Sequence, residues 1–300
     1  MKKLACIFGA IMFLIPAVAG AQALPFTAID SDAKSLSKAG ADLIQTSPAA
    51  IPYSDATLSA AAGYTMWQPT AANENIINVD AAYKIGDKFG VALDFMYGMH
   101  PKYVITNSTA TASGEFAPSD MHVELGLGWK FLPFLSLGAE VGYATSSIAK
   151  DYSYGAVTAD VFLMTKVAGF KATAGVSNLG TAVTSKSGTK YSLPSAASVG
   201  LGYDMSFADV HAVGVSLDAD YYFALGFAAA LGVEYSYADM AFVRAGYNMG
   251  GEAVLPSFAS IGAGVKFAGV ELNLAYLLGF STLHSVAAKN TLSIGLGYSF

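Results

Sequence analysis

The nine residues Leu292-Ser-Ile-Gly-Leu-Gly-Tyr-Ser-Phe300 decide the fold class. Large apolar residues alternate here with Ser and Gly, so a β-strand formed by this stretch has one apolar face. The apolar positions are Leu292, Ile294, Leu296, Tyr298 and Phe300. A soluble β-sandwich can end in an alternating strand, and so can a membrane β-barrel. The rest of the chain must discriminate between these two fold classes.

The composition favours a membrane protein. Hydrophobic residues make up 54% of the 300 residues and charged residues only 13%, whereas soluble domains carry roughly a quarter charged residues. A membrane-spanning helix needs about 18 consecutive apolar residues, and no such run follows residue 23. The 31 Gly, 17 Tyr and 18 Phe suit spanning strands with aromatic residues at the lipid interfaces.

The first residues have the pattern of a signal peptide. Lys2 and Lys3 precede an apolar run over 4–19, and small residues follow. The expected signal peptide is 1–21, with cleavage after 23 as the other possibility. Cys6 is the only cysteine, so the mature chain is expected to hold no thiol site. The leader and the strand pattern together predict the outer membrane of a Gram-negative bacterium.

The closing stretch also resembles the signal by which outer-membrane barrels are recognised for insertion. Its five apolar residues are therefore the expected insertion signal, read by the barrel-assembly machinery, with outer-membrane lipid as their later environment. The formal net charge of −6, without a basic stripe, excludes nucleic acid as an expected partner.

Residues 24–54 do not alternate. Ser31 to Gly40 predicts a short helix capped by Ser31 or Asp32, and an irregular, proline-containing stretch follows. Such a segment either hangs in the periplasm or folds into the lumen as a plug. Its six large apolar residues favour burial, and hence the plug.

Residues 55–300 predict a transmembrane antiparallel β-barrel of about fourteen strands. The clearest strand is 89–99, where large apolar residues alternate with smaller or polar ones. The strand charges test the prediction, because a cation on the lipid face costs roughly 2 to 4 kcal/mol. All fall opposite the apolar row of their strand: Asp80, Lys84, Asp94, Glu124, Lys130, Glu140, Asp160, Lys171, Asp218, Glu234, Arg244, Lys266 and Glu271.

Connections of two lengths are expected at the two ends of the barrel. Short turns are predicted at 86–87, 133, 238–239 and 268–269, and longer loops at 100–120, 146–154 and 178–192. The short turns are expected in the periplasm and the long loops outside the cell. Aromatic residues near the strand ends are expected to lie at the membrane interfaces: Trp67, Trp129, Phe131, Phe134, Tyr221, Tyr222 and Phe223.

No catalytic, cofactor-binding or metal-binding residues are predicted, and an enzyme is not expected. The four histidines, including His100 and His284, are scattered and lack the spacing of a metal site. His122 with Glu124 on an inward face is the only local candidate for catalysis. Such a pair is more often an ordinary hydrogen-bonded pair of the lumen.

Motifs along the mature chain resemble the PorV/PorQ family of the FadL-like barrel superfamily. They run from Pro25-Phe-Thr-Ala-Ile-Asp-Ser-Asp-Ala-Lys-Ser35 through Ser47-Pro48-Ala49, which stands in the place of the family's Asn-Pro-Ala plug motif, to Ser177-Asn-Leu-Gly180 and Arg244-Ala-Gly-Tyr247. Lys34 and Ser47 depart from the Arg and Asn of the family pattern. The resemblance implies an outer-membrane barrel without enzymatic activity, plugged at its amino terminus.

The same resemblance implies an accessory role in type IX-like protein secretion or in the surface attachment of exported proteins, with the secretion translocon and those proteins as partners. One alternative is a FadL-like channel for hydrophobic small molecules. That channel predicts an apolar pocket beneath the long loops, with Tyr103, Val104, Ile105 and Phe116 as candidate ligand contacts or as simple loop packing. The other alternative is a structural barrel that scaffolds partners.

Overall fold

The computed structural model describes residues 22–69, 72–107, 110–185, 187–250, 257–279 and 290–300. The expected signal peptide, 1–21, and His284 lie outside these residues. Within the described part, no helix combines the length and the apolar character needed to cross a membrane.

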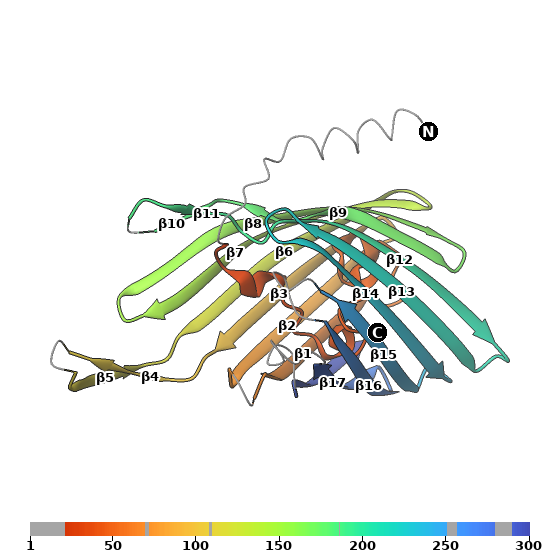
Figure 1. The fold of residues 1–300 in the computed structure, drawn as a ribbon. Helices are drawn as coiled ribbons and strands as arrows, with labels where there is room; N and C mark the ends of the chain where they lie inside the picture. The colour runs from red at the N-terminus through yellow and green to blue at the C-terminus, as the bar shows by residue number, and fades with distance from the viewer. Residues whose placement is uncertain (1–21, 70–71, 108–109, 186, 251–256, 280–289) are drawn as a thin grey trace.

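The described strands form one closed antiparallel barrel of fourteen strands, as the alternation predicts (Figure 1). Strand β1 (Leu58–Trp67) pairs with β18 (Leu292–Ser299) and closes the seam. The other strands are β2 (Glu74–Ile85), β3 (Phe89–Met99), β6 (Ser119–Leu132), β7 (Leu135–Ala149), β8 (Tyr152–Val167), β9 (Phe170–Gly180), β12 (Ala196–Phe207), β13 (His211–Tyr222), β14 (Gly226–Tyr237), β15 (Ala241–Met249), β16 (Phe258–Phe267) and β17 (Val270–Gly279).

The connections divide between the two ends of the barrel. Every connection at one end is short, and this turn end contains the four predicted turns. The other, or loop, end carries two extra hairpins, β4 (Tyr103–Thr106) with β5 (Ala112–Phe116), and β10 (Val183–Thr184) with β11 (Lys190–Tyr191). The predicted loop 146–154 is wrong, because β7 and β8 continue to a tight turn at 150–151. Their polar outer residues obscure the alternation, and a bulge near Ser147 shifts the register.

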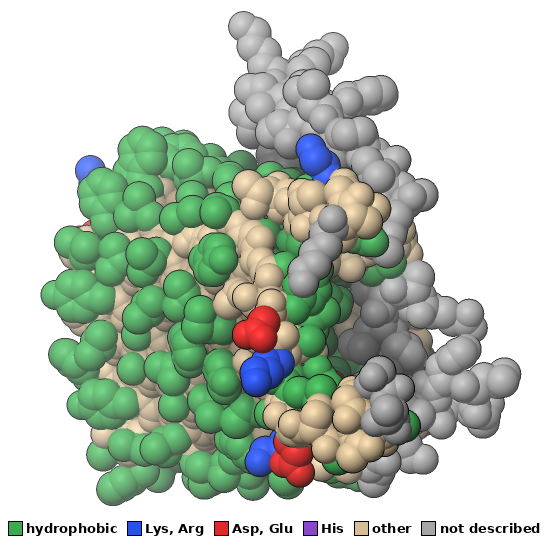
Figure 2. Space-filling view, turned by 90° about the vertical axis from the view of Figure 1, so that its left-hand side faces the viewer, with side chains coloured by type: hydrophobic (Ala, Val, Ile, Leu, Met, Phe, Trp, Pro, Cys, Tyr) green, Lys and Arg blue, Asp and Glu red, His purple; other side chains and the backbone are tan. Residues whose placement is uncertain are grey.

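The exterior is apolar, and the five alternating residues of the closing stretch lie on it. Their exposed fractions run from 38% at Leu292 to 64% at Phe300. Figure 2 shows hydrophobic side chains over most of the described part of one side. A closed barrel leaves no unpaired strand edge, and an apolar exterior matches lipid, so this is the form in which strands cross the outer membrane. The chain is an outer-membrane β-barrel.

Two aromatic predictions are wrong, those for Trp67 and Tyr222. Tyr222 lies on the inward side of β13, where it lines the space between the wall and the amino-terminal segment. Trp67 is only 3% exposed and packs inside the barrel with Leu36 and Ile76, away from the membrane interface. In β1 the outward positions are even-numbered, as the exposed Tyr64 and Met66 show, so Trp67 points inwards. The outward residues Trp129, Phe131, Phe134 and Tyr221 are exposed.

Candidate functional site

The amino-terminal segment runs inside the barrel from the loop end to the turn end. At the loop end, the N–H of Ala23 donates to the carbonyl of Ser192 at 2.9 Å. At the turn end, Lys84 and Lys130 donate to the carbonyls of Ser54 and Pro52. Between these points lie η1 (Pro25–Ala28), α2 (Ala33–Leu36), α3 (Leu43–Thr46) and η2 (Pro48–Tyr53). We call residues 22–54 the lumen segment.

The local sequence explains the first helix of the lumen segment. Asp32 caps α2, because its carboxylate accepts from the N–H of Ser35 at 2.8 Å. The chain turns away at Gly40, whose φ of +82° suits glycine. The predicted cap Asp32 and stop Gly40 are thus confirmed, although α2 itself covers only 33–36.

The Ser47-Pro48-Ala49 motif is buried against the wall. Ser47 caps η2 by accepting from the N–H of Ala49 at 3.2 Å, and the hydroxyl of Ser136 donates to the carbonyl of Ala49 at 2.6 Å. Gly128 and Gly138 permit this approach. A Cβ at Gly128 would lie 2.2 Å from the carbonyl oxygen of Pro48, and one at Gly138 would lie 2.4 Å from the amide nitrogen of Ala49. Whether the motif closes the lumen in function stays a prediction.

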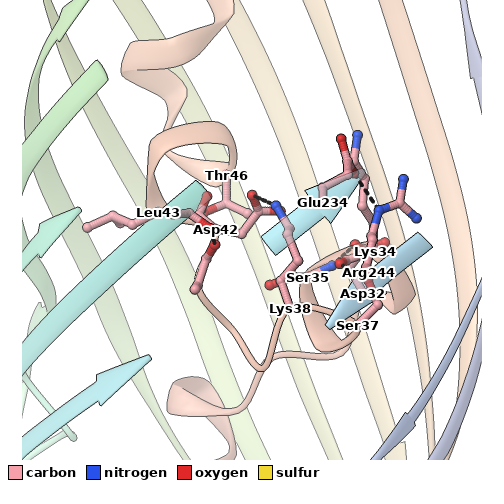
Figure 3. A network of polar contacts seen from close by, with 12 residues as sticks. Asp32, Lys34, Ser35, Ser37, Lys38, Asp42, Leu43, Thr46, Glu234 and Arg244 are labelled. Atoms are coloured by element: carbon pink, nitrogen blue, oxygen red, sulfur yellow. Dashed lines mark hydrogen bonds and ion pairs between the residues drawn. The ribbon is translucent and has the colours of Figure 1, made fainter. Parts of the chain in front are cut away.

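A charged network lies where the first half of the lumen segment meets the wall (Figure 3). Arg244 on β15 is fully enclosed and donates to Glu234 and Asn273, and to Glu271 at 3.1 Å. Lys34 lies in the field of the same two glutamates. Burial opposes its charge, but Glu271 and Glu234 raise the pKa of Lys34 above its ordinary value. Within the segment, Lys38 pairs with Asp42.

Hydrogen bonds attach the lumen segment to the wall around the barrel. They have in common that a wall side chain pairs with a backbone group of the lumen segment. They are Thr65 with the carbonyl of Ser31, Ser260 with that of Ser37, Ser216 with that of Ala41, Asp218 with the N–H of Leu43, and Asn178 with the carbonyl of Thr27. The lumen segment is therefore bound to nearly every side of the wall, through groups that water would otherwise satisfy.

A cavity of about 720 Å³ lies between the lumen segment and the wall. Apolar side chains from both sides line part of it: Phe26, Ile29 and Ile51 from the segment, and Met96 and Phe162 from β3 and β8. Its volume falls within the range of about 300 to 1,000 Å³ that is typical of small-molecule sites. The cavity is the candidate functional site of this chain.

Five carboxylates on five successive wall strands line the same cavity: Asp80, Asp94, Glu124, Glu140 and Asp160. We call them the acidic arc. Asp80 faces Asp94, Asp94 faces Glu124, and Glu140 faces Asp160 across the strand pairs. The alternation along each strand predicts from the sequence that these side chains point into the barrel. Their alignment at one depth is not predicted, because it depends on the register between strands.

The structure brings the predicted pair His122 and Glu124 together with Thr158. Nε2 of His122 lies 3.2 Å from Oε1 of Glu124, and the hydroxyl of Thr158 lies 3.1 Å from both atoms. This compact triangle is the hydrogen-bonded arrangement expected of an ordinary lumen pair. Within the described ranges, no three His, Cys, Asp or Glu side chains are grouped to hold a metal ion.

The four predicted ligand contacts lie on the β4–β5 hairpin, outside the cavity lining. The rings of Tyr103 and Phe116 pack at 5.7 Å, and the hydroxyl of Tyr103 donates to the carbonyl of Ile148 at 3.0 Å. Tyr103 and Val104 are exposed, and Ile105 lies between them and the hairpin turn. A role of these residues in ligand binding stays a prediction.

Sequence comparison assigns no relative: no family model and no curated protein matches the chain. Solved structures do match. A mutant of the monoaromatic hydrocarbon channel TodX has a TM-score of 0.58 at 12% identity, with 89% of this chain and 98% of that chain covered. The toluene transporter TbuX of Ralstonia pickettii has a TM-score of 0.56 at 9% identity, with coverages of 86% and 92%. A FadL homologue of Pseudomonas aeruginosa has a TM-score of 0.52 at 12% identity, with coverages of 90% and 98%.

These likenesses concern the fold. They agree with the FadL-like part of the sequence resemblance and give no support to the PorV/PorQ assignment within it. The first two of these structures carry the names of a channel and a transporter rather than of enzymes, and the expectation that this chain is not an enzyme stays a prediction. The chain has the fold of the FadL-like outer-membrane barrels, with a cavity between its lumen segment and its wall.

Proposed function

We propose that this chain is an outer-membrane channel for apolar small molecules and that the lumen segment is its plug. The observation that carries the proposal is the cavity of about 720 Å³, which lies inside the barrel and is lined in part by apolar side chains. Buried apolar surface favours an uncharged, water-avoiding ligand by about 25 cal/mol per Å². The names of the structural matches support the same ligand class.

Passage of a ligand through the barrel requires the lumen segment to move relative to the wall. Its hydrogen bonds to the wall are spread over many strands, and η2 packs on β3, β6, β7 and β8 at the turn end. The lumen segment lines the cavity from Phe26 to Ser54, and turn-end wall residues such as Ser59 and Ser299 line it too, so the segment lies along the whole path of a ligand. The proposed function thus includes a movement of the lumen segment, and fixing the segment should stop transport.

A disulfide between the lumen segment and the wall tests this step. The Cβ of Ala33 lies 3.2 Å from the position of a Cβ on Gly295, just below the separation of about 3.5 to 4.5 Å found in disulfides. The only natural cysteine, Cys6, lies in the expected leader, so the pair Ala33→Cys and Gly295→Cys has no competing thiol in the mature chain. The two single variants serve as controls.

The readout is uptake of N-phenylnaphthylamine, an uncharged dye that fluoresces in lipid, by cells whose outer membrane contains the chain. We expect uptake above that of cells without the chain, loss of that uptake in the oxidised double variant, and recovery after reduction. Equal uptake with and without the chain would refute the channel. Full uptake by the oxidised double variant would refute the plug.

The secretion role implied by the PorV/PorQ resemblance gains no support from the structural matches. It predicts that the chain, isolated in mild detergent, is recovered with a large translocon or with exported proteins. Such recovery, together with failure of the dye experiment, would favour secretion over the channel.

A further inference from the structure

We infer that the lumen discriminates by charge: it admits uncharged apolar molecules and rejects apolar molecules that carry a carboxylate or a sulfonate. This inference rests on the proposed channel function and specifies its substrate class. The residues that determine the selectivity are those of the acidic arc.

The acidic arc has no strong cationic partner within the described part of the chain. Its five carboxylates occupy adjacent strands, and the ion pair recorded for them is that of His122 with Glu124. These carboxylates face one another across the strand pairs, and groups of like charge at that spacing repel. Even a partly ionised arc gives this side of the cavity a negative potential.

The described cations of the lumen are already engaged elsewhere. Lys84, Lys130 and Lys166 donate to backbone carbonyls of the lumen segment at the turn end. The side chain of Arg244 is wholly enclosed, with Glu234 and Glu271 as its ion partners. None of these four groups is available to bind the acidic head of a ligand without first losing its own partner.

Lys34 and Lys266 are the lysines among the lining residues, and acidic side chains of the chain act on both. Lys34 lies in the field of Glu271 and Glu234, and Lys266 is 2.9 Å from Asp239. An anionic ligand in this cavity would lose its water and would compete with Glu234, Glu271 and Asp239 for Lys34 and Lys266, which is costly away from bulk water. An uncharged ligand of the same shape incurs no such cost and retains the apolar contacts with Phe26, Ile29, Met96 and Phe162.

A matched pair of dyes tests the inference. N-phenylnaphthylamine and anilinonaphthalene sulfonate share one aromatic skeleton, and only the second carries a permanent negative charge. Both fluoresce when they reach lipid, so one assay on cells with the wild-type chain reports both. After subtraction of uptake by cells lacking the chain, we expect uptake of the sulfonate to be at most about one tenth of the uptake of N-phenylnaphthylamine. The reason is that like charges repel strongly where little water screens them.

Isosteric neutralisation separates charge from size. The triple variant Asp94→Asn, Glu124→Gln, Glu140→Gln removes three charges of the acidic arc at almost constant volume, and it spares Asp160, which accepts from the N–H of Asn178. We expect sulfonate uptake to rise several-fold while uptake of the uncharged dye stays unchanged. The control variant Asp87→Asn, Asp151→Asn, Asp209→Asn removes three exposed charges outside the lumen and should leave both rates unchanged.

The outcomes distinguish the inference from the function on which it rests. Equal uptake of the two dyes by the wild-type chain would overturn the inference and leave the channel standing. A sulfonate that stays excluded from the neutralised variant would show exclusion by size and also overturn it. Failure of both dyes to enter through the chain would overturn the channel and the inference together.

Discussion

The backbone N–H of Leu43 donates to Oδ2 of Asp218 at 2.8 Å and thereby joins the lumen segment to β13. This N–H begins α3, where a helix has no internal acceptor for its first donors. The wall carboxylate thus replaces a cap, which Asp42 does not provide.

The Asp218 variants follow from this bond. Asp218→Ala leaves the N–H of Leu43 without its acceptor and should weaken the attachment of α3 by about 1 to 3 kcal/mol. Asp218→Asn keeps an acceptor oxygen and should preserve the attachment. Hydrogen exchange at Leu43 measures the difference. Equal exchange rates in the Ala variant and the wild type would contradict the assigned role.

Gly128 and Gly138 provide a test of the wall beneath the Ser47-Pro48-Ala49 motif. An added Cβ at either position collides with backbone atoms, which cannot rotate away, so each change to alanine should displace the motif and cost about 1 to 3 kcal/mol. We expect faster protease cleavage within 22–54 and faster uptake of the uncharged dye. Gly114→Ala on β5 is the control, because a Cβ there meets nothing within 4 Å.

Asp30 should make attachment of the lumen segment depend on pH. Its carboxyl is open to the cavity but surrounded by the barrel, and this burial, with smaller contributions from Asp42 and Asp32, raises its pKa from 3.8 to about 7. A raised carboxyl pKa favours the protonated form in the attached state. The stabilisation is therefore complete below pH 3.8 and is lost as the pH rises through about 7.

Protease cleavage of the lumen segment at several pH values measures this dependence. Cleavage of the wild-type chain should accelerate between pH 4 and pH 7, which is the interval between the two pKa values. Asp30→Asn cannot ionise and should flatten that profile. A profile that Asp30→Asn leaves unchanged would assign the dependence to another group.

Arg244 should be the most sensitive residue of the charged network. Arg244→Met leaves Glu234 and Glu271 without their partner, and breaking a buried pair costs up to about 3 to 5 kcal/mol. The melting temperature of the barrel in detergent should fall. Adding Glu234→Gln and Glu271→Gln to Arg244→Met should restore most of the loss, since the uncompensated charges are then gone. No recovery in the triple variant would indicate that packing of the Arg244 side chain, rather than its charge, was lost.

The sequence predicted the barrel because alternation is a local property that lipid enforces. The outward side of each strand must be apolar, so Leu292 to Phe300 and the charges of the other strands could be assigned to a side without coordinates. Strand β1 shows the limit of this method. Its residues 60–62 are all Ala, so the sequence does not show which side of β1 faces the lipid, and Trp67 was assigned to the membrane interface although it points inwards.

The candidate site could be predicted only in part. The apolar residues of 24–54 indicated burial, but its path depends on contacts with strands up to more than 200 residues distant, such as Ser37 with Ser260. The acidic arc was equally hidden, since Glu140 and Asp160 become neighbours only through the pairing of β7 with β8. The exposed position of the β4–β5 hairpin likewise depends on tertiary structure, which residue types alone do not reveal.

The path of the lumen segment has a consequence for the order of biogenesis. Residue 23 is held at one end of the barrel and residue 54 at the other, while the N–H groups of Thr57 and Leu58 both donate to the carbonyl of Phe300 across the seam. We expect the lumen segment to enter the curved wall before the last strand joins the first, because the closed barrel holds the segment at both ends. Synthesis places these two steps at opposite ends of the chain, so this order would require the wall to stay an open sheet until the last strand arrives.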